Sequence, residues 1–257
     1  MNPFSLKNTT FLGKLARLPL KLIPPHAVVR ILQGAGRGLK WIKGSGNNSY
    51  WLGTYEADKQ KAIKETLKKG MVFYDLGAHV GIFTLLAATT VGERGLVIAF
   101  EPSERNISYL EKHIILNGFG NIAVKKGAVA KKSGSTRFKE GGSSAGGHIS
   151  DGGTVVRTYS IDELVVGGLR KPDVVKIDVQ GATLLALQGM ERTLKEGNIK
   201  LFIAIDNTPR AGIEPFTKRD VHNFLKSAGY TTVGMNGEKV PDSAVEEVNE
   251  IIAYKAK

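Results

Sequence analysis

The chain has 257 residues, 42% of them hydrophobic, and carries a formal net charge of +12. This length suits one α/β domain with an appendage and can bury a sizeable core. The absence of cysteine excludes disulfides, thiolate zinc sites and cysteine nucleophiles.

The N-terminal segment is basic. No acidic residue precedes Glu56, whereas eight basic residues do: Lys7, Lys14, Arg17, Lys21, Arg30, Arg37, Lys40 and Lys43. Apolar residues from Phe11 to Leu22 recur at the spacing of an amphipathic helix, and Pro24-Pro25 ends the helix predicted over 11–23. Such a segment suits an anionic lipid surface, nucleic acid or an acidic substrate. The alternative is a solvated basic surface, which the scarcity of aromatic residues slightly favours.

Neither a membrane span nor a signal peptide is expected. No run approaches the ~20 apolar residues of a membrane span. Lys14, Arg17 and Lys21 interrupt the apolar character of the N-terminus, which is unlike a signal peptide. We therefore expect a cytoplasmic protein. No feature of the sequence indicates an oligomeric state.

The elements that follow predict an α/β sheet. Two short runs, 28–32 and 40–42, flank a glycine-rich turn and predict a hairpin. From Met71 onward, apolar runs alternate with helical periodicities, which is typical of a mostly parallel sheet with helices on both faces. Strands are expected at 71–75, 96–100, 122–126, 173–178, 199–205, 231–235 and 250–254. Helices are expected at 58–69, 80–90, 104–117, 181–196 and 217–228.

The turn after the first predicted strand indicates the ligand. Gly77 and Gly81 allow a ligand to approach the backbone closely. Their G-x-x-x-G spacing differs from the G-x-G-x-x-G of dinucleotide sites, and the carboxylate of Asp75 would repel a pyrophosphate. S-adenosylmethionine (SAM) carries an amino group and a sulfonium instead. Glu101 ends the next apolar run, where an acid can accept both ribose hydroxyls. The alternative is a strand-end turn with two capping acids.

Five motifs, taken in order, resemble those of FkbM-type methyltransferases. They are residues 75–81 (DLGAHVG), 99–102 (AFEP), 116–117 (LN), 127–129 (GAV) and 176–182 (KIDVQGA). The resemblance covers about Trp51 to Tyr230 and implies a class I, SAM-dependent, mostly O-methylating enzyme. It implies a Rossmann-like, seven-stranded sheet whose last strand is antiparallel. Gln180 and Thr183 stand where the family usually has glutamates.

The resemblance also implies a cofactor site. Asp75, Gly77 and Glu101 are expected to contact SAM, with Ala128 near the adenine. The predicted cofactor site as a whole comprises Glu56, Asp75, Gly77, Ala78, His79, Gly81, Glu101, Pro102, Ala128 and Asp178. Tyr55 and Glu56 could reach the methionine end of SAM, or Glu56 could simply favour the start of a helix. We expect residues 1–50 to form a cap over this site and residues 51–257 to form the methyltransferase domain.

A glycine-rich insertion, residues 140–153, lies between the third and fourth predicted strands, and its flanks alternate as strands do. It is expected to act as an active-site lid, because loops at the carboxyl ends of parallel strands line the cleft; a surface hairpin tip is the alternative. His148 within it is a candidate catalytic base, although a lone loop histidine is more often a bystander.

A metal site is also predicted. Asp178 ends the fourth strand, and Asp206 and Asn207 end the fifth. Adjacent strands lie about 4.8 Å apart, so these oxygen ligands are expected to converge and to suit Mg²⁺. The arrangement is similar to that of catechol-type O-methyltransferases, although Gly181 occupies the position of their lysine base. Alternatively, Asp178 alone positions substrate or SAM, while Asp206 and Asn207 cap a turn.

The sequence therefore predicts methyl transfer from SAM to a hydroxyl of a small molecule of the sugar, lipid or natural-product type. The acceptor would be deprotonated by Asp178, by a metal bound to it, or by His148. A second hypothesis makes RNA ribose the acceptor and uses the basic N-terminus. A third makes the protein a non-catalytic module that contacts a membrane surface through the segment Phe11 to Leu22.

Overall fold

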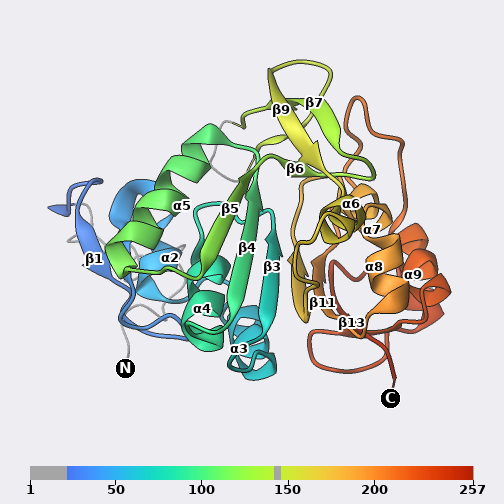
Figure 1. The fold of residues 1–257 in the computed structure, drawn as a ribbon, viewed down its shortest axis with the longest axis horizontal. Helices are drawn as coiled ribbons and strands as arrows, with labels where there is room; N and C mark the ends of the chain where they lie inside the picture. Colours follow the sequence, from blue (N-terminus) through green and yellow to red (C-terminus); the bar gives the residue numbers. More distant parts are fainter. Residues whose placement is uncertain (1–21, 142–145, 257) are drawn as a thin grey trace, which may run out of the picture.

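The computed structural model describes residues 22–141 and 146–256. Its centre is a seven-stranded sheet with the strand order β12-β13-β11-β10-β3-β4-β5 (Figure 1). Strand β13 runs antiparallel to both of its neighbours, and the other neighbouring pairs are parallel. The strands are β3 (Val72–Leu76), β4 (Leu96–Glu101), β5 (Ile122–Lys126), β10 (Val174–Ile177), β11 (Lys200–Ala204), β12 (Thr231–Gly234) and β13 (Glu250–Tyr254). The predicted Rossmann-like class I architecture is confirmed.

Helices cover both faces of the sheet (Figure 1). Successive side chains of a strand point to opposite faces, and β3 is buried throughout. Phe73 packs with α4 in one apolar cluster, and Tyr74 packs with α7, α8 and α9 in another. The helices are α3 (Ala57–Thr66), α4 (Ile82–Val91), α5 (Glu104–Asn117), α6 (Ile161–Val166), α7 (Thr183–Gln188), α8 (Glu191–Glu196) and α9 (Lys218–Ser227).

The single helix predicted over 181–196 is wrong, because the chain forms α7 and α8 with a break at Gly189-Met190. A Cβ at Gly189 would lie 2.1 Å from the carbonyl oxygen of Ala130. The carbonyl oxygen of Gly189 accepts bonds from the Asp162 amide and the Ser160 hydroxyl. This carbonyl binds another segment, so it is not part of a continuous helix. The short helix α6, which contains Asp162, is a second element absent from the sequence-based prediction.

The described part of the N-terminal segment packs against α5. The predicted hairpin is present as β1 (Val28–Arg30) and β2 (Lys40–Ile42), and α2 (Asn48–Leu52) follows it. Trp41 is fully buried and stacks on the His113 ring with 3.9 Å between ring centroids. Trp41 and Tyr50 belong to the same apolar cluster as Phe73 of β3. Residues 22–50 are thus continuous with the packing of the sheet.

The insertion forms a second, four-stranded sheet of order β6-β9-β7-β8. It comprises β6 (Ala128–Val129), β7 (Gly134–Lys139), β8 (His148–Ile149) and β9 (Thr154–Tyr159). The two predicted flanking strands, β7 and β9, are confirmed. In Figure 1 they stand at the top, beyond the end of β5.

Two predictions fall largely outside the described residues. They concern most of the helix over 11–23, with Lys14, Arg17 and Lys21, and the centre of the glycine-rich insertion, 142–145. Within residues 22–141 and 146–256, no helix is both long enough and apolar enough to cross a membrane.

His113 gives the fold a pH dependence. Its Nδ1 lies 2.8 Å from the carbonyl oxygen of Val80, to which it donates, and its Nε2 accepts from the Ile42 amide at 3.0 Å. The bond from the Ile42 amide requires a neutral ring, and burial lowers the pKa of His113 from 6.5 to about 4, although the bond to Val80 opposes that shift. The unfolded chain therefore binds more protons between these two values, so stability falls as the pH decreases from 6.5 towards 4.

We predict that His113→Gln reduces the acid dependence of the unfolding free energy. The wild type should lose up to about 3 kcal/mol through this group between pH 7 and pH 4, at about 1.36 kcal/mol per pKa unit. Urea unfolding at several pH values measures the slope. His26→Gln, which removes an exposed histidine, is the control and should behave as the wild type does. Equal slopes for the wild type and His113→Gln would contradict the prediction.

Candidate active site

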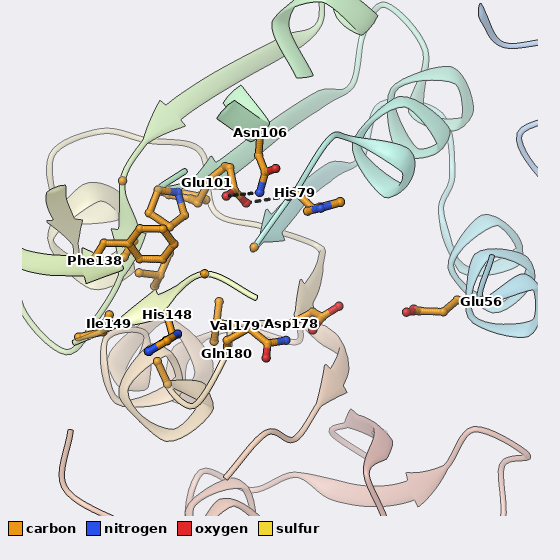
Figure 2. Close-up of a pocket in the computed structure, with 18 of the residues that line it drawn as sticks. Glu56, His79, Glu101, Asn106, Phe138, His148, Ile149, Asp178, Val179 and Gln180 are labelled. Carbon is orange, nitrogen blue, oxygen red and sulfur yellow. Dashed lines mark hydrogen bonds between the residues drawn. The ribbon is translucent and has the colours of Figure 1, made fainter. Parts of the chain in front are cut away.

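A cavity of about 230 Å³ lies over the carboxyl ends of β3, β4 and β10. These ends contribute Gly77, Glu101 and Asp178 to its lining. The insertion and the segment before α3 provide opposite walls. In Figure 2, Phe138, His148 and Ile149 lie on one side and Glu56 on the other. Ligands of open α/β sheets bind at this edge of the sheet, and the cavity brings together residues that are far apart in the sequence.

Glu101 is held at the floor of the cavity by three N–H donors. Its Oε2 accepts from the His79 amide at 2.7 Å, and its Oε1 accepts from the Ser103 amide and from Asn106 Nδ2, each at 3.1 Å (Figure 2). Burial raises the pKa of Glu101, and the bonds from Asn106, Ser103 and His79 oppose that rise. Because all three partners donate, the arrangement suits the ionised carboxylate, whose remaining lone pairs can accept further hydroxyls.

The turn from β3 to α4 is shaped by left-handed backbone. Gly77 has φ +78° and Gly81 has φ +98°. His79 (φ +53°) and Glu56 (φ +40°) are the two non-glycine residues with positive φ in the described chain. Both line the cavity. Such conformations are costly and tend to cluster at functional sites.

The position of Asp75 differs from the prediction. Its side chain is fully buried, and it is not among the residues that line the cavity. One carboxylate oxygen accepts from the Thr84 hydroxyl at 2.6 Å, and the other lies 3.2 Å from Nζ of Lys176. Lys176 of β10 thus pairs with the carboxylate that the sequence-based prediction assigned to SAM. Asp75 supports the turn from beneath.

Of the other residues predicted to bind the cofactor, some line the cavity and some do not. Ala78 and Gly81 are buried and do not line the cavity. A Cβ at Gly81 would lie 2.5 Å from Leu110 Cδ1, so this glycine serves the packing of α5. The residues that the structure brings together are Glu56, Gly77, His79, Glu101, Pro102, Ala128, His148 and Asp178.

The second acidic wall is formed by Glu56 and Asp178. Glu56 Oε2 lies 2.6 Å from Nζ of the buried Lys59, which also contacts Glu250 Oε1 of β13 at 2.5 Å. Burial lowers the pKa of Lys59, but the bonds to Glu250 and Glu56 outweigh it and the net shift is upward. The ammonium therefore stays charged and holds Glu56 beside the cavity, opposite Glu101.

Two stacked tyrosines adjoin this wall. The rings of Tyr50 and Tyr55 lie 4.2 Å apart between centroids, and Tyr50 Oη lies 3.3 Å from Nδ1 of His79. Burial raises the pKa of Tyr50 to about 12, so its phenol is neutral at physiological pH. The wall therefore offers aromatic faces and neutral hydroxyls.

The insertion contributes an apolar wall and one imidazole. Phe138 and Ile149 are buried there, and a Cβ at Gly147 would lie 2.4 Å from Phe138 Cζ. His148 Nδ1 lies 3.0 Å from the carbonyl oxygen of Gly146. A carbonyl only accepts, so Nδ1 carries the proton in that bond and Nε2 is the basic atom of the neutral ring.

The predicted metal site does not assemble. Asp178 lines the cavity, but Asp206 and Asn207 do not. The two Asp206 oxygens accept from the Gly181 amide at 3.1 Å and the Thr208 amide at 2.8 Å, and Arg210 Nη2 lies 3.7 Å away. In the part of the chain that the structure describes, no cluster of three or more His, Asp or Glu side chains is placed to hold a metal. The donor set does not fit Mg²⁺, because Asp206 is already bound within its own loop.

The cavity does fit SAM. A buried carboxylate with free lone pairs, Glu101, lies near the small residues Gly127 and Ala128, which leave room for a flat base. On the other side Glu56 and Asp178 offer negative charge to an amino group and a sulfonium. Among the residues that the structure describes, no lysine or arginine lines this cavity, in contrast to a site for a pyrophosphate.

Sequence reasoning missed several lining residues. Asn106 follows Ser103, the N-cap of α5, by three positions and so points back to Glu101. Phe138 belongs to the insertion, and it lines the cavity together with Glu101 at the end of β4 and Asp178 after β10. Gln180 lines the cavity, whereas Thr183 donates to the carbonyl oxygen of Ala204. The N-cap at Ser103 could have indicated Asn106 from the sequence. No feature of the sequence indicates that Phe138 lines the cavity.

Comparison with known proteins gives consistent matches. The family described as methyltransferase FkbM domain matches residues 75–232. The hexuronic acid methyltransferase AglP of Haloferax volcanii is 28% identical over 181 residues, which are 69% of this chain and 70% of that protein.

Two solved structures are similar to this chain, and the first of them shares its fold. A methyltransferase FkbM from Methylobacillus flagellatus KT aligns with a TM-score of 0.50 and 17% identity, over 74% of this chain and 45% of that chain. The present chain thus spans less than half of that protein's length. A precorrin-6y C5,15-methyltransferase from Geobacter metallireducens GS-15 aligns with a TM-score of 0.48 and 16% identity, over 77% and 89% of the two chains.

We predict that Asp206 stabilises its loop and binds no metal. Asp206→Ala should lower the unfolding free energy by about 1–2 kcal/mol, because the Gly181 and Thr208 amides lose their acceptor. Urea unfolding measures this loss. Millimolar Mg²⁺ should leave the melting temperature of the wild type unchanged, since a bound ion would raise it. A rise with Mg²⁺ that Asp206→Ala abolishes would contradict the prediction.

Proposed function

The chain belongs to the FkbM methyltransferase family and is a SAM-dependent methyltransferase, and from this premise we propose that it methylates a hydroxyl of a sugar-type small molecule. The acceptor class we favour is a hexuronic acid or its conjugate. The support for that class is the relative whose name specifies hexuronic acid, similar over two thirds of both chains.

One observation carries the proposal. The buried carboxylate of Glu101 and the acidic wall of Glu56 and Asp178 open into the same cavity. SAM supplies a methyl group already activated on a sulfonium. The protein therefore has two main tasks, to orient the donor and acceptor and to exclude water, and orientation alone can be worth about 7–11 kcal/mol.

The residues divide between the two ends of the cofactor. Glu101 accepts hydrogen bonds from the ribose hydroxyls, and Pro102 and Ala128 lie against the adenine. Glu56 accepts the amino group of the methionine end, where Lys59 fixes its carboxylate. Gly77 and His79 form the backbone surface between these ends. The acceptor enters beside Asp178, His148 and Gln180, which line the remaining part of the cavity.

The acceptor proton needs a base. As the oxygen–carbon bond forms, the sulfur–carbon bond breaks and the hydroxyl proton leaves. His148 Nε2 is the basic atom of a ring whose Nδ1 donates to Gly146, so it is one candidate. Asp178, at the end of β10, is the other. No step involves a metal.

A methyl-transfer assay tests the function. The protein and SAM are incubated with glucuronic and galacturonic acids and their glycosides, with the matching neutral hexoses, and with RNA. S-adenosylhomocysteine release and the methylated product are measured by mass spectrometry. Turnover with the uronic acids above that with the hexoses is expected. Preferential turnover of RNA would overturn the acceptor class, and no calorimetric heat with SAM or S-adenosylhomocysteine would overturn the function.

We predict that Glu101→Gln weakens S-adenosylhomocysteine binding about 10- to 100-fold, because a charge-assisted hydrogen bond contributes about 1.5–3 kcal/mol. Isothermal titration calorimetry measures the affinity. Glu104→Gln, which alters an exposed acid three residues later, at the start of α5, should leave the affinity unchanged. Equal affinities for the two variants would remove Glu101 from the ribose site.

A further inference from the structure

Lys176 is a buried cation directly beneath the cavity. It lies in β10, whose four residues are all buried, and its side chain is 3% exposed. It is not among the lining residues and has no role in the methyl transfer proposed above. A lysine in such a place is unusual, because an ammonium is costly to bury unless it is well paired.

The ammonium of Lys176 has three oxygen neighbours. Nζ donates to the carbonyl oxygen of Gly77 at 2.7 Å, and it lies 3.2 Å from Asp75 Oδ1 and 3.8 Å from Asp178 Oδ2. Gly77 and Asp178 line the cavity, whereas Asp75 is fully buried below it. The lysine therefore links an internal carboxylate to two groups that face the ligand.

These groups meet where β3 and β10 end. The Asp178 amide donates to the carbonyl oxygen of Leu76 at 3.0 Å, and a Cβ on Gly77 would lie 2.0 Å from the carbonyl oxygen of Asp178. The two backbones are thus in direct contact above Lys176. Any shift of the ammonium would move the Gly77 carbonyl and the Asp178 carboxylate together.

The charge of Lys176 is maintained. Burial alone lowers its pKa, but the negative charges of Asp75 and Asp178 outweigh it and the net shift is upward. The ammonium also lies 5.4 Å from the centroid of the Phe83 ring, which favours a cation. For stability alone, a buried ion pair can usually be replaced by apolar residues at little cost. The position of the Lys176–Asp75 pair beneath the cavity therefore points to a role other than stability.

We propose that Lys176 is a positioning residue for methyl transfer, which holds the Gly77 carbonyl and the Asp178 carboxylate at the cavity floor in one fixed arrangement. This inference rests on the proposed function, in which those two residues face the cofactor and the acceptor. The three N–H bonds of an ammonium can point at three oxygens at once, which neither an amide nor a thioether can do.

The test separates positioning from mere stabilisation. Lys176→Met alone leaves Asp75 buried without its cation, so it is combined with Asp75→Asn, which keeps an acceptor for Thr84 and removes the unpaired charge. Lys176→Gln, likewise combined with Asp75→Asn, is a second variant of similar length. Lys171→Met, which removes an exposed lysine paired with Glu196 on the surface, is the control. Melting temperature, S-adenosylhomocysteine affinity, kcat and KM are measured for each.

Both double variants are expected to melt cooperatively and to lose at least tenfold in kcat, with a smaller change in KM for the acceptor. A group that acts through alignment of the transition state affects kcat more than uniform binding. If either cooperatively folded variant retains the kcat of the wild type, the lysine only stabilises the fold and the proposal is overturned. A wild type that binds no S-adenosylhomocysteine would refute the proposed function instead.

Discussion

The site depends on the direct contact of two strand ends. Gly77 has no side chain, so its backbone lies against the carbonyl of Asp178, where any Cβ would clash. This contact brings the ends of β3 and β10 together, and the Lys176 ammonium occupies the space below them. The floor of the cavity is therefore built from backbone, with its charges arranged underneath. A bulkier residue at Gly77 would separate the strands and change the position of both acids.

The acids at the two ends of the cavity are also held by hydrogen bonds and ion pairs. At one end three N–H donors hold Glu101, and Ser103, which supplies one of them, also donates through its hydroxyl to Glu140 at the end of β7. The insertion is thereby tied to the residue proposed to hold the ribose. At the other end Lys59 joins Glu56 to Glu250 of β13. Lys59 and Ser103 thereby connect acids of the site to elements distant in sequence, β13 and the insertion.

The charge pattern also agrees with the chemistry. Glu56, Glu101 and Asp178 line the cavity, so a cationic methyl donor would meet negative charge. The buried Lys59 and Lys176 lie behind these acids and offset part of their charge. A sulfonium donor does not require a strong Lewis acid, and Asp206 is already bound to its own loop. In the reaction that we propose, the protein supplies alignment and a base for one proton.

The sequence by itself determined the strands of the central sheet, most helices and the glycine turn after β3, because these follow from local periodicity and from glycines that only certain backbones need. It also indicated Glu101 as a candidate, since the end of an apolar run is a local signal, and this residue lines the cavity. Tertiary structure alone decided which acids face the ligand. The sequence alone predicted that Asp75 binds SAM and that Asp206 binds a metal. In the structure Lys176 pairs with Asp75, and the Gly181 amide donates to Asp206, from other segments of the chain. The fold of the insertion likewise brought Phe138 into the cavity, since contacts between distant segments leave no periodicity in the sequence.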